Sequence, residues 1–531
     1  MIDALRHLTH ATGSENPFAS ALVCLCSSLG IVYAAYLYID YRRLIHRLGN
    51  LPGFTTFPQP LSILQGINEK GLGKDPFIVV KYQPFQDAGC DAVAWVSVWP
   101  KARLSYALAD PDAIKDVTSD RTRFVKPSEC YTAINVFGEN IVSSEGETWK
   151  RHRRIMAPAF SEKQYQLVWK ETAIIMDELI DRVWNSAPEV VIHDAKDITM
   201  PAAIMVISAA GFGQRISWYD EDQIPEGHRM TFRDALVKMS PELITLMAIP
   251  SWAMGLTAKF RAARLAASEI HKYMLEMIAE RRHKQSDGSG HDIFTLLMEA
   301  MDDDDVKVTE RELTGNVFVL LLAGHETTAH TLAFTLAFLA LYPETQEHIF
   351  REIQSITDNF QRELSFSDMG SLTYTMAVFY ETLRLMPSAT YIPKRCTEDT
   401  SLAVANLKGG KTVIPISAGT YILMDLMGLH YNPRVWPDPY SFKPERFLGE
   451  WNRDAFMAFN TGPRGCTGRK FAETEVTVIL TKIVAQYTIA ITENPTCPEE
   501  SFEQRKARVF TIEPGITTTP ARIPLTLRRR D

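Results

Sequence analysis

Hydrophobic residues first gather near the N-terminus, where Phe18 to Ile39 form 22 residues without a charge. A run of this length spans a bilayer, whose hydrocarbon core needs about 20 apolar residues in a helix. Arg42, Arg43 and Arg47 follow, and no positive excess precedes the run. By the positive-inside rule we expect a transmembrane anchor over 18–39, with residues 1–17 lumenal and the bulk of the chain cytosolic. The alternative is a cleaved signal peptide, whose apolar region is normally shorter and follows its basic residues.

The pattern then changes several times along the chain. Residues 40–60 form a basic and proline-rich hinge, in which Leu51-Pro52-Gly53, Pro58 and Pro60 predict a stiff, non-helical exit from the anchor. Runs typical of β-strands follow at 92–99 and 104–108, and strand signals return near 400–425 and 509–528. Most of 149–356 has helical character. Because strands and helices do not alternate as in a doubly wound sheet, the pattern predicts a mainly α fold with small peripheral β-sheets.

One predicted helix is unusually long. Thr309 and Glu312 fit a capping box, and helix-compatible sequence continues to Leu341, where Tyr342-Pro343 ends it. A helix of about 32 residues that is apolar nearly all round must be buried through the middle of the protein. Inside it lies Ala323-Gly324-His325-Glu326-Thr327, and an acid is costly there unless it has a role. A hydrated kink at Gly324 is the alternative interpretation of these polar positions.

The same segment resembles the zinc-protease helix, but its spacing differs. His325 and His330 are five residues apart rather than four. Five residues turn a helix by roughly 500°, so the two side chains point about 140° apart. Two ligands of one metal need one helix face, and this spacing therefore excludes a zinc site.

Composition narrows the class of protein. The chain has 531 residues, 46% hydrophobic and 23% charged, which are globular values. The net charge of −8 gives no electrostatic case for a nucleic-acid partner. The seven cysteines are odd in number and include no Cys-x-x-Cys pair, so neither a disulfide framework nor a zinc knuckle is indicated. The main body is expected to face a reducing compartment.

Cys466 has the most informative surroundings of any residue. It lies in Phe459-Asn-Thr-Gly-Pro-Arg464-Gly-Cys466-Thr-Gly468, just before an apolar helical stretch. Glycines let backbone N–H groups crowd the sulfur, and such hydrogen bonds stabilise a metal-bound thiolate. Arg464 is placed to pair with a carboxylate on a planar cofactor. An isolated cysteine in a turn is more often a buried structural residue, which is the alternative that this frame of glycines and arginine argues against.

This segment resembles the haem-binding loop of the cytochrome P-450 superfamily, Phe-x-x-Gly-x-Arg-x-Cys-x-Gly, at every fixed position. The resemblance runs from about residue 50 to the end, and to the microsomal, fungal-type members above all. It implies a cytochrome P-450 fold with an N-terminal transmembrane helix, and a haem-thiolate catalytic domain over residues 61–531. It also implies haem b, with iron held by the axial thiolate of Cys466, and haem contacts from Phe459, Arg464 and Gly468.

The resemblance assigns roles to further residues. Glu326 and Thr327 would deliver protons for oxygen activation, and Gly324 would leave room for dioxygen. Trp149 and Arg153 resemble the pair that holds a haem propionate. A further propionate contact falls at Lys394, with Arg395 as the alternative. The structural Glu-x-x-Arg plus Arg triad corresponds to Glu381, Arg384 and Arg446, which alone would be interpreted as a surface ion pair.

The implied activity is insertion of oxygen from O2 into a hydrophobic organic substrate such as a terpenoid, sterol, fatty acid or aromatic compound. Electrons would come from an NADPH-cytochrome reductase, with cytochrome b5 as a possible second donor, at the endoplasmic reticulum membrane. The alternatives are a reductase-independent haem-thiolate isomerase or dehydratase, and a non-enzymatic haem-binding membrane protein. Residues 241–260 either dip into the membrane lipid or pack in the core. The residues expected at the substrate are Phe318, Leu322, Ala323, Ala389 and Ile392.

Overall fold

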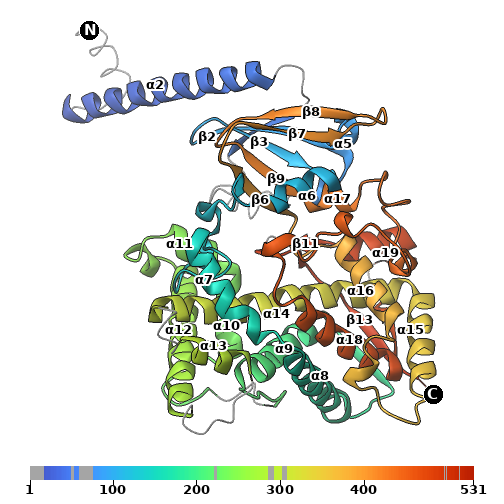
Figure 1. The fold of residues 1–531 in the computed structure, drawn as a ribbon. Helices are drawn as coiled ribbons and strands as arrows, with labels where there is room; N and C mark the ends of the chain where they lie inside the picture. Colours follow the sequence, from blue (N-terminus) through green and yellow to red (C-terminus); the bar gives the residue numbers. More distant parts are fainter. Residues whose placement is uncertain are drawn as a thin grey trace.

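Helix α2 (Pro17–Leu48) is the first element of the computed structural model, and it projects away from the other helices (Figure 1). The structure describes residues 17–48, 53–58, 76–219, 224–284, 292–301, 308–494, 497, 499–513 and 515–530. Residues 21–46 of α2 make a candidate membrane span, within which an 18-residue stretch has a mean hydropathy of 2.0. The helix continues through the arginines at 42, 43 and 47 and ends at Leu48, before the predicted non-helical exit over 51–60. Residues 49–52 and 59–60 of the predicted hinge lie outside the described residues.

Small β-sheets lie on the side of the molecule next to α2 (Figure 1). The largest has the strand order β1-β2-β3-β9-β6-β4, and β7 and β8 pair with each other beside it. Its strands are β1 (Gly53–Pro58), β2 (Ala92–Trp99), β3 (Arg103–Leu108), β9 (Tyr421–Asp425), β6 (Tyr391–Cys396) and β4 (Phe124–Val125). β1 pairs in parallel with β2, which places part of the predicted hinge inside the sheet.

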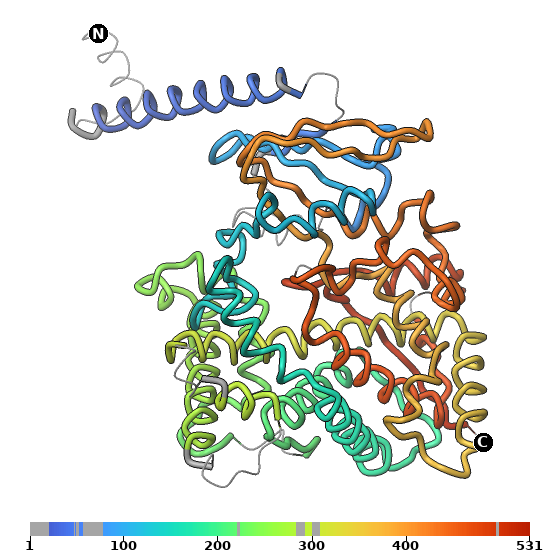
Figure 2. Tube along the Cα trace, in the orientation of Figure 1, coloured from blue at the N-terminus to red at the C-terminus, as the bar shows by residue number. Residues whose placement is uncertain are grey.

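The remaining strands form one three-stranded sheet and two pairs of strands. They are β5 (Glu189–Ile192), β7 (Thr400–Ala405), β8 (Lys411–Ile416), β10 (Tyr487–Ile491), β11 (Ile512–Glu513), β12 (Thr519–Pro520) and β13 (Leu525–Arg529). β13 pairs with both β10 and β5. Arg530 then pairs with Glu347 of α15 (Pro343–Ile356) at 2.7 Å. This end of the chain lies far from α2 (Figure 2).

Helices make up the larger part of the molecule. They are α4 (Pro76–Val80), α5 (Gln83–Ala88), α6 (Pro111–Ser119), α7 (Gly146–Met156), α8 (Glu162–Asp177), α9 (Lys196–Val206), α10 (Phe232–Met239), α11 (Leu243–Ala248), α12 (Ala258–Lys284), α13 (Ile293–Met301), α14 (Glu310–Leu341), α15 (Pro343–Ile356), α16 (Thr373–Leu385), α17 (Leu426–His430), α18 (Arg469–Gln486) and α19 (Phe502–Val509). This confirms the mainly α fold with small peripheral sheets.

Helix α14 crosses the middle of the molecule (Figure 1). Thr309 caps it through a hydrogen bond from the Glu312 N–H, and the Glu312 side chain accepts from the Thr309 N–H. The capping box predicted from the sequence is therefore confirmed, together with the end of the helix at Leu341. α14 is long and apolar enough to pass for a membrane span, but most of it is buried inside the protein. Part of α14 forms one wall of the cavity at the candidate active site.

Candidate active site

A cavity of about 890 Å³ lies where α14 meets α7, the segment after α16, the β11–β12 turn and the loop before α18. Most of the residues predicted from the sequence for the site line it. They are Trp149, Arg153, Ala323, Gly324, Thr327, Ala389, Ile392, Lys394, Phe459, Arg464, Cys466 and Gly468. Segments that are more than 300 residues apart in the chain thus meet around one space.

Cys466 faces this cavity from a tightly held loop. Its N–H donates to the carbonyl of Phe459 over 2.8 Å, and Gly462 adopts a left-handed backbone with φ of 66°. Burial raises the pKa of the Cys466 thiol, and the backbone N–H groups of Gly468 and Arg469 oppose this by hydrogen bonding to the sulfur. Gly468 is also the N-cap of α18, whose positive end favours a thiolate.

Four cations line the wall beside Cys466, namely Lys126, Arg153, Lys394 and Arg464. Arg464 lies 4.0 Å from the centroid of the Trp149 ring and pairs with Glu145, the carboxylate that raises the pKa of its guanidinium. Burial, with repulsion between neighbouring cations, lowers the pKa of Arg464 to about 10, of Lys394 to about 8 and of Lys126 to about 7. This wall therefore carries more buried positive charge than the protein itself neutralises.

The structure distinguishes Lys394 from Arg395. The Lys394 side chain is buried, lines the cavity and donates to the carbonyl of Phe124 over 3.3 Å. Arg395 points to the other side of β6 and pairs with Glu129 at 2.9 Å. Successive residues of a strand face opposite sides, so only Lys394 can contact a group in the cavity.

These features fit the haem that the sequence predicts. A cysteine sulfur lies on the cavity wall, and a cluster of cations with a single acid partner lies nearby. Such a cluster is suited to the two carboxylates of a haem, because they would supply the missing negative charge. The axial sulfur ligand would come from Cys466.

Glu326 and Thr327 are neighbours on α14 but face different surroundings. The Thr327 hydroxyl lines the cavity and donates to the carbonyl of Ala323 over 2.9 Å. Glu326 does not line the cavity; its Oε1 accepts from the Thr517 hydroxyl over 3.1 Å. Burial raises the pKa of Glu326 to about 7. The two side chains predicted to act together are thus not hydrogen bonded to each other.

Gly324 lines the cavity, but its missing side chain serves packing. A Cβ there would come within 2.8 Å of Ile207 Cδ1, in the π-helical segment Ile207–Gly211 that continues α9. Ile207 lines the cavity as well, so the role of Gly324 in leaving room for dioxygen stays a prediction. The glycine lets α14 and the segment that continues α9 approach each other closely.

Phe318 and Leu322 do not contact the cavity, which corrects their assignment to the substrate. Both are buried in the main hydrophobic core, where Phe318 packs edge-on against Phe137 at 4.9 Å between ring centroids. Their neighbours Val319 and Leu320 line the cavity instead. Because α14 is apolar on nearly all sides, its sequence does not reveal which face borders the site.

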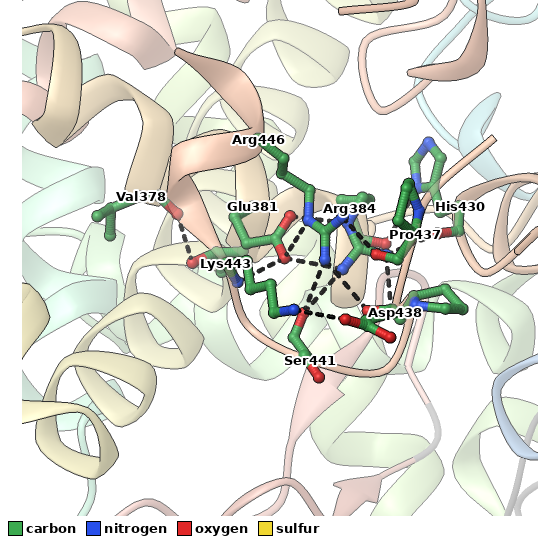
Figure 3. A network of polar contacts seen from close by, with 11 residues as sticks. Val378, Glu381, Arg384, His430, Pro437, Asp438, Ser441, Lys443 and Arg446 are labelled. Carbon is green, nitrogen blue, oxygen red and sulfur yellow. Dashed lines mark hydrogen bonds and ion pairs between the residues drawn. The ribbon is translucent and has the colours of Figure 1, made fainter.

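Glu381, Arg384 and Arg446 meet in one buried network (Figure 3). Arg384 donates from Nε and Nη2 to the two carboxylate oxygens of Glu381 over 2.7 and 2.8 Å. Its guanidinium also donates to the carbonyls of His430, Pro439 and Ser441. Arg446 donates to Glu381 over 3.2 Å. The pair is fully buried, so interpreting it as a surface ion pair is wrong. The triad does not line the cavity.

The site also holds Lys126 and Thr517. Lys126 lies in the loop 124–137, which the sequence leads us to expect at the substrate pocket without singling out this residue, and its ammonium is 3.6 Å from the centroid of the Tyr131 ring. Thr517 lies in the β11–β12 turn, 191 positions from Glu326, and sequence reasoning missed it because it belongs to no local motif.

Comparisons with known proteins agree with this geometry. The sequence model of the cytochrome P-450 family matches residues 85–518. Cytochrome P-450 monooxygenase 124 of Postia placenta is 41% identical over 96% of this chain and 100% of its own length. A cytochrome P-450 monooxygenase of Arthrobotrys oligospora is 29% identical over 74% of this chain and 76% of its own. A crystal structure of a cytochrome P-450 haem domain has a TM-score of 0.70 at 21% identity, covering 90% of this chain and 99% of that one, and supports the fold.

Proposed function

Since this chain belongs to the cytochrome P-450 family and is a monooxygenase of that family, we propose that it oxidises a hydrophobic organic molecule at a haem held by Cys466. The observation that carries the proposal is the cysteine on the cavity wall, beside a cluster of cations with one acid partner. When bound, the haem supplies the activation of dioxygen with two electrons from outside the chain.

The residues of the chain have separate tasks in this proposal. Cys466 provides a thiolate, which the N–H groups of Gly468 and Arg469 stabilise. Arg153, Lys394 and Arg464, with the Trp149 ring, hold the carboxylates of the haem. Thr327 presents a hydroxyl to the cavity, where it hands on a proton.

The substrate is proposed to be apolar because many of the residues that line the cavity are apolar. Ala323, Ala389 and Ile392 line the cavity together with Val142, Val319 and Leu320. Such a wall binds hydrocarbon by burial and offers few hydrogen bonds for orientation. Terpenoids, sterols, fatty acids and aromatic compounds all meet this requirement.

We infer that the electrons come from an NADPH-dependent reductase at the endoplasmic reticulum, with cytochrome b5 as a second possible donor. The candidate span in α2 supports a membrane-bound enzyme. Residues 241–260 support it as well, because Trp252 is 78% and Leu256 68% exposed while Leu243 and Met254 are buried. In this proposal the exposed residues of the segment contact the membrane and the buried ones pack in the core.

The carbon monoxide spectrum of the reduced protein tests the ligand. We expect wild type to give the thiolate-type Soret band and Cys466→Ser to lose it. Cys130 also lines the cavity and offers a matched control, because burial raises the pKa of its thiol to about 12. Cys130→Ser should keep the band. A thiolate-type band in Cys466→Ser would overturn the assignment.

Ligand titrations test the substrate. The ferric protein is titrated with terpenoids, sterols, fatty acids and small aromatics while the Soret band is followed. A saturable shift to high spin identifies a class for turnover with reductase and NADPH. Binding without any oxygenated product from that class would contradict the proposed monooxygenation.

A further inference from the structure

The proton path from Glu326 to the cavity poses a geometric problem. The carboxyl group is buried, its Oε2 has no hydrogen-bond partner within the described residues, and Glu326 is not part of the cavity wall. Thr327 does line the cavity, but its hydroxyl donates to the carbonyl of Ala323 and is not hydrogen bonded to Glu326. A proton on Glu326 therefore needs another group to reach the cavity, where Thr327 can hand it on.

Thr517 is in the right place to be that group. It lines the cavity, and its hydroxyl also donates to Glu326 Oε1 over 3.1 Å. The hydroxyl and the backbone N–H of Thr517 both favour the ionised form of this carboxyl. Thr517 is thus the residue that contacts both Glu326 and the cavity.

The turn that carries Thr517 is fixed from several sides. The neighbouring Thr518 donates its N–H to Ser388 over 3.0 Å and its hydroxyl to the carbonyl of Pro387 over 2.6 Å. Thr519 donates to the carbonyl of Thr517 over 2.9 Å. A Cβ on Gly515 would meet Thr519 Oγ1 at 2.2 Å, so the close turn requires glycine there.

His330 holds the Thr517 hydroxyl from the other side. The two atoms Nδ1 and Oγ1 are 2.8 Å apart. Because the single hydroxyl proton of Thr517 goes to Glu326, Nδ1 must carry a proton and donate it. Burial, with the charge of Lys196, lowers the pKa of His330 to about 3, so the imidazole is neutral. The resulting chain is His330 to Thr517 to Glu326.

We propose that Thr517 connects Glu326 with the cavity, holding the carboxyl in place and carrying its proton to the oxygen chemistry. The step rests on the proposed monooxygenase function. The Thr517 hydroxyl turns, gives its own proton to an acceptor oxygen in the cavity and takes the proton of the Glu326 carboxyl. One O–H bond breaks and one forms at Thr517, the Glu326 carboxyl becomes a carboxylate, no electron moves, and a proton from bulk solvent restores the carboxyl.

Three variants separate this role from general damage to the turn. Thr517→Val keeps the shape and backbone N–H but removes the hydroxyl, and Thr517→Ser restores it. Thr511→Val is the matched control, because its hydroxyl donates only to the carbonyl of Ala507 over 3.1 Å. The carbon monoxide spectrum of each variant establishes that the holoenzyme is intact.

The first readout does not depend on turnover. The infrared band of the protonated Glu326 carboxyl, assigned with Glu326→Gln, is followed through a pH titration of the ferric holoenzyme. Thr517→Val is expected to shift its midpoint upward by at least half a pH unit, because a hydrogen bond to the carboxylate is lost. Thr517→Ser and Thr511→Val should keep the wild-type midpoint. An unchanged midpoint in Thr517→Val would overturn the contact.

The second readout is the share of NADPH that ends as hydrogen peroxide during turnover with a substrate. Thr517→Val is expected to raise this share at least threefold, and Thr517→Ser to return it near wild type. A shifted infrared midpoint with an unchanged peroxide share would overturn the relay, since water alone would then carry the proton. If wild type itself forms no oxygenated product from any substrate that shifts the Soret band, the proposed function has failed, whereas the infrared result still decides the contact.

Discussion

Glu326 imposes a pH-dependent cost on the folded protein. Burial disfavours its charged form, so its pKa rises from the ordinary 4.5 to about 7. The unfolded chain releases this proton at lower pH than the folded protein does, so the unfolded state binds fewer protons between these two values. The contribution of Glu326 to the free energy of unfolding therefore falls as pH rises through this window, by roughly 3 kcal/mol in total.

Replacing Glu326 by glutamine removes the ionisable group and should remove this pH dependence. We expect Glu326→Gln to exceed wild type in free energy of unfolding by up to roughly 3 kcal/mol at pH 8 and to match it more closely at pH 5. Denaturant unfolding at both pH values measures the difference. The exposed Glu363→Gln serves as control and should show no such trend. A difference between Glu326→Gln and wild type that does not vary with pH would contradict the buried, protonated carboxyl.

Arg384 shows how much one buried guanidinium can organise. It satisfies both oxygens of Glu381 and the carbonyls of His430, Pro439 and Ser441 at once. His430 accepts the Met457 N–H on Nε2 over 3.0 Å, which links the network to the chain leading to Cys466. A planar fork of five donors can reach these acceptors, whereas an ammonium cannot.

Arg384→Lys should therefore behave as a severe change despite its retained charge. We expect a loss of about 3–5 kcal/mol in stability, because buried acceptors and the Glu381 carboxylate lose partners. Haem content per chain and thermal unfolding measure this loss. Lys443→Met is the matched control: it breaks only the exposed pair with Asp438 and should cost less than about 1 kcal/mol. Near-wild-type stability of Arg384→Lys would refute the structural role.

At the scale of elements, two glycines allow the loop before α7 to touch α14. A Cβ on Gly315 would come within 2.6 Å of the carbonyl oxygen of Gly138, and one on Gly138 within 2.0 Å of that of Arg311. Next to this contact, Asn316 accepts the Ile141 N–H over 2.9 Å. Ile141 lines the cavity, so the same contact that docks the loop also shapes the site.

Gly315→Ala should displace this loop, because the clash is with backbone that cannot rotate away. We expect destabilisation of about 1–3 kcal/mol and a weaker Soret shift with any ligand that binds the wild-type cavity. Thermal unfolding and ligand titration measure the two effects. Gly370→Ala is the control, since a Cβ there meets nothing within 4 Å. Unchanged stability of Gly315→Ala would mean that the loop moves away from α14 without cost, which would contradict a tight contact at this position.

Local signals explain which elements could be predicted from the sequence. The bounds of α14 follow from the Thr309 capping box and Tyr342-Pro343, and the Cys466 loop follows from its glycines. The strand β1 was not predicted, because it forms only by parallel pairing with β2. Local proline signals predicted a hinge there instead.

The residues of the candidate site likewise divide into those that a local motif reveals and those that no local motif reveals. The cavity-lining positions of Trp149, Arg153, Lys394 and Cys466 agree with motifs in the sequence. Thr517 was missed because its partner lies 191 positions away, and no short-range pattern encodes that contact.

At the scale of the whole molecule, two groups of large apolar side chains are exposed and available to contact a membrane. Leu22, Leu25, Leu29, Ile31 and Val32 of α2 are more than half exposed, and so are Trp252 and Leu256. The structure shows the segment after α11 projecting from the helical part of the molecule (Figure 1). Exposed large apolar side chains at two distant places lead us to predict attachment to a membrane at more than one point.

Removing residues 1–39 and changing the second feature should release the protein in two steps. We expect the shortened chain to keep weak binding to neutral phospholipid vesicles, and Trp252→Ser with Leu256→Ser in that chain to lower this binding at least tenfold. Burial of a large apolar side chain contributes about 1.5–3 kcal/mol, so two of them suffice for this change. Vesicle flotation measures the bound fraction, and the carbon monoxide spectrum checks the fold. Val413→Ser together with Leu407→Ser, on exposed residues at the β7–β8 hairpin, is the matched control and should leave binding unchanged. Equal loss in both double variants would mean that general surface hydrophobicity, and not the segment after α11, holds the enzyme at the membrane.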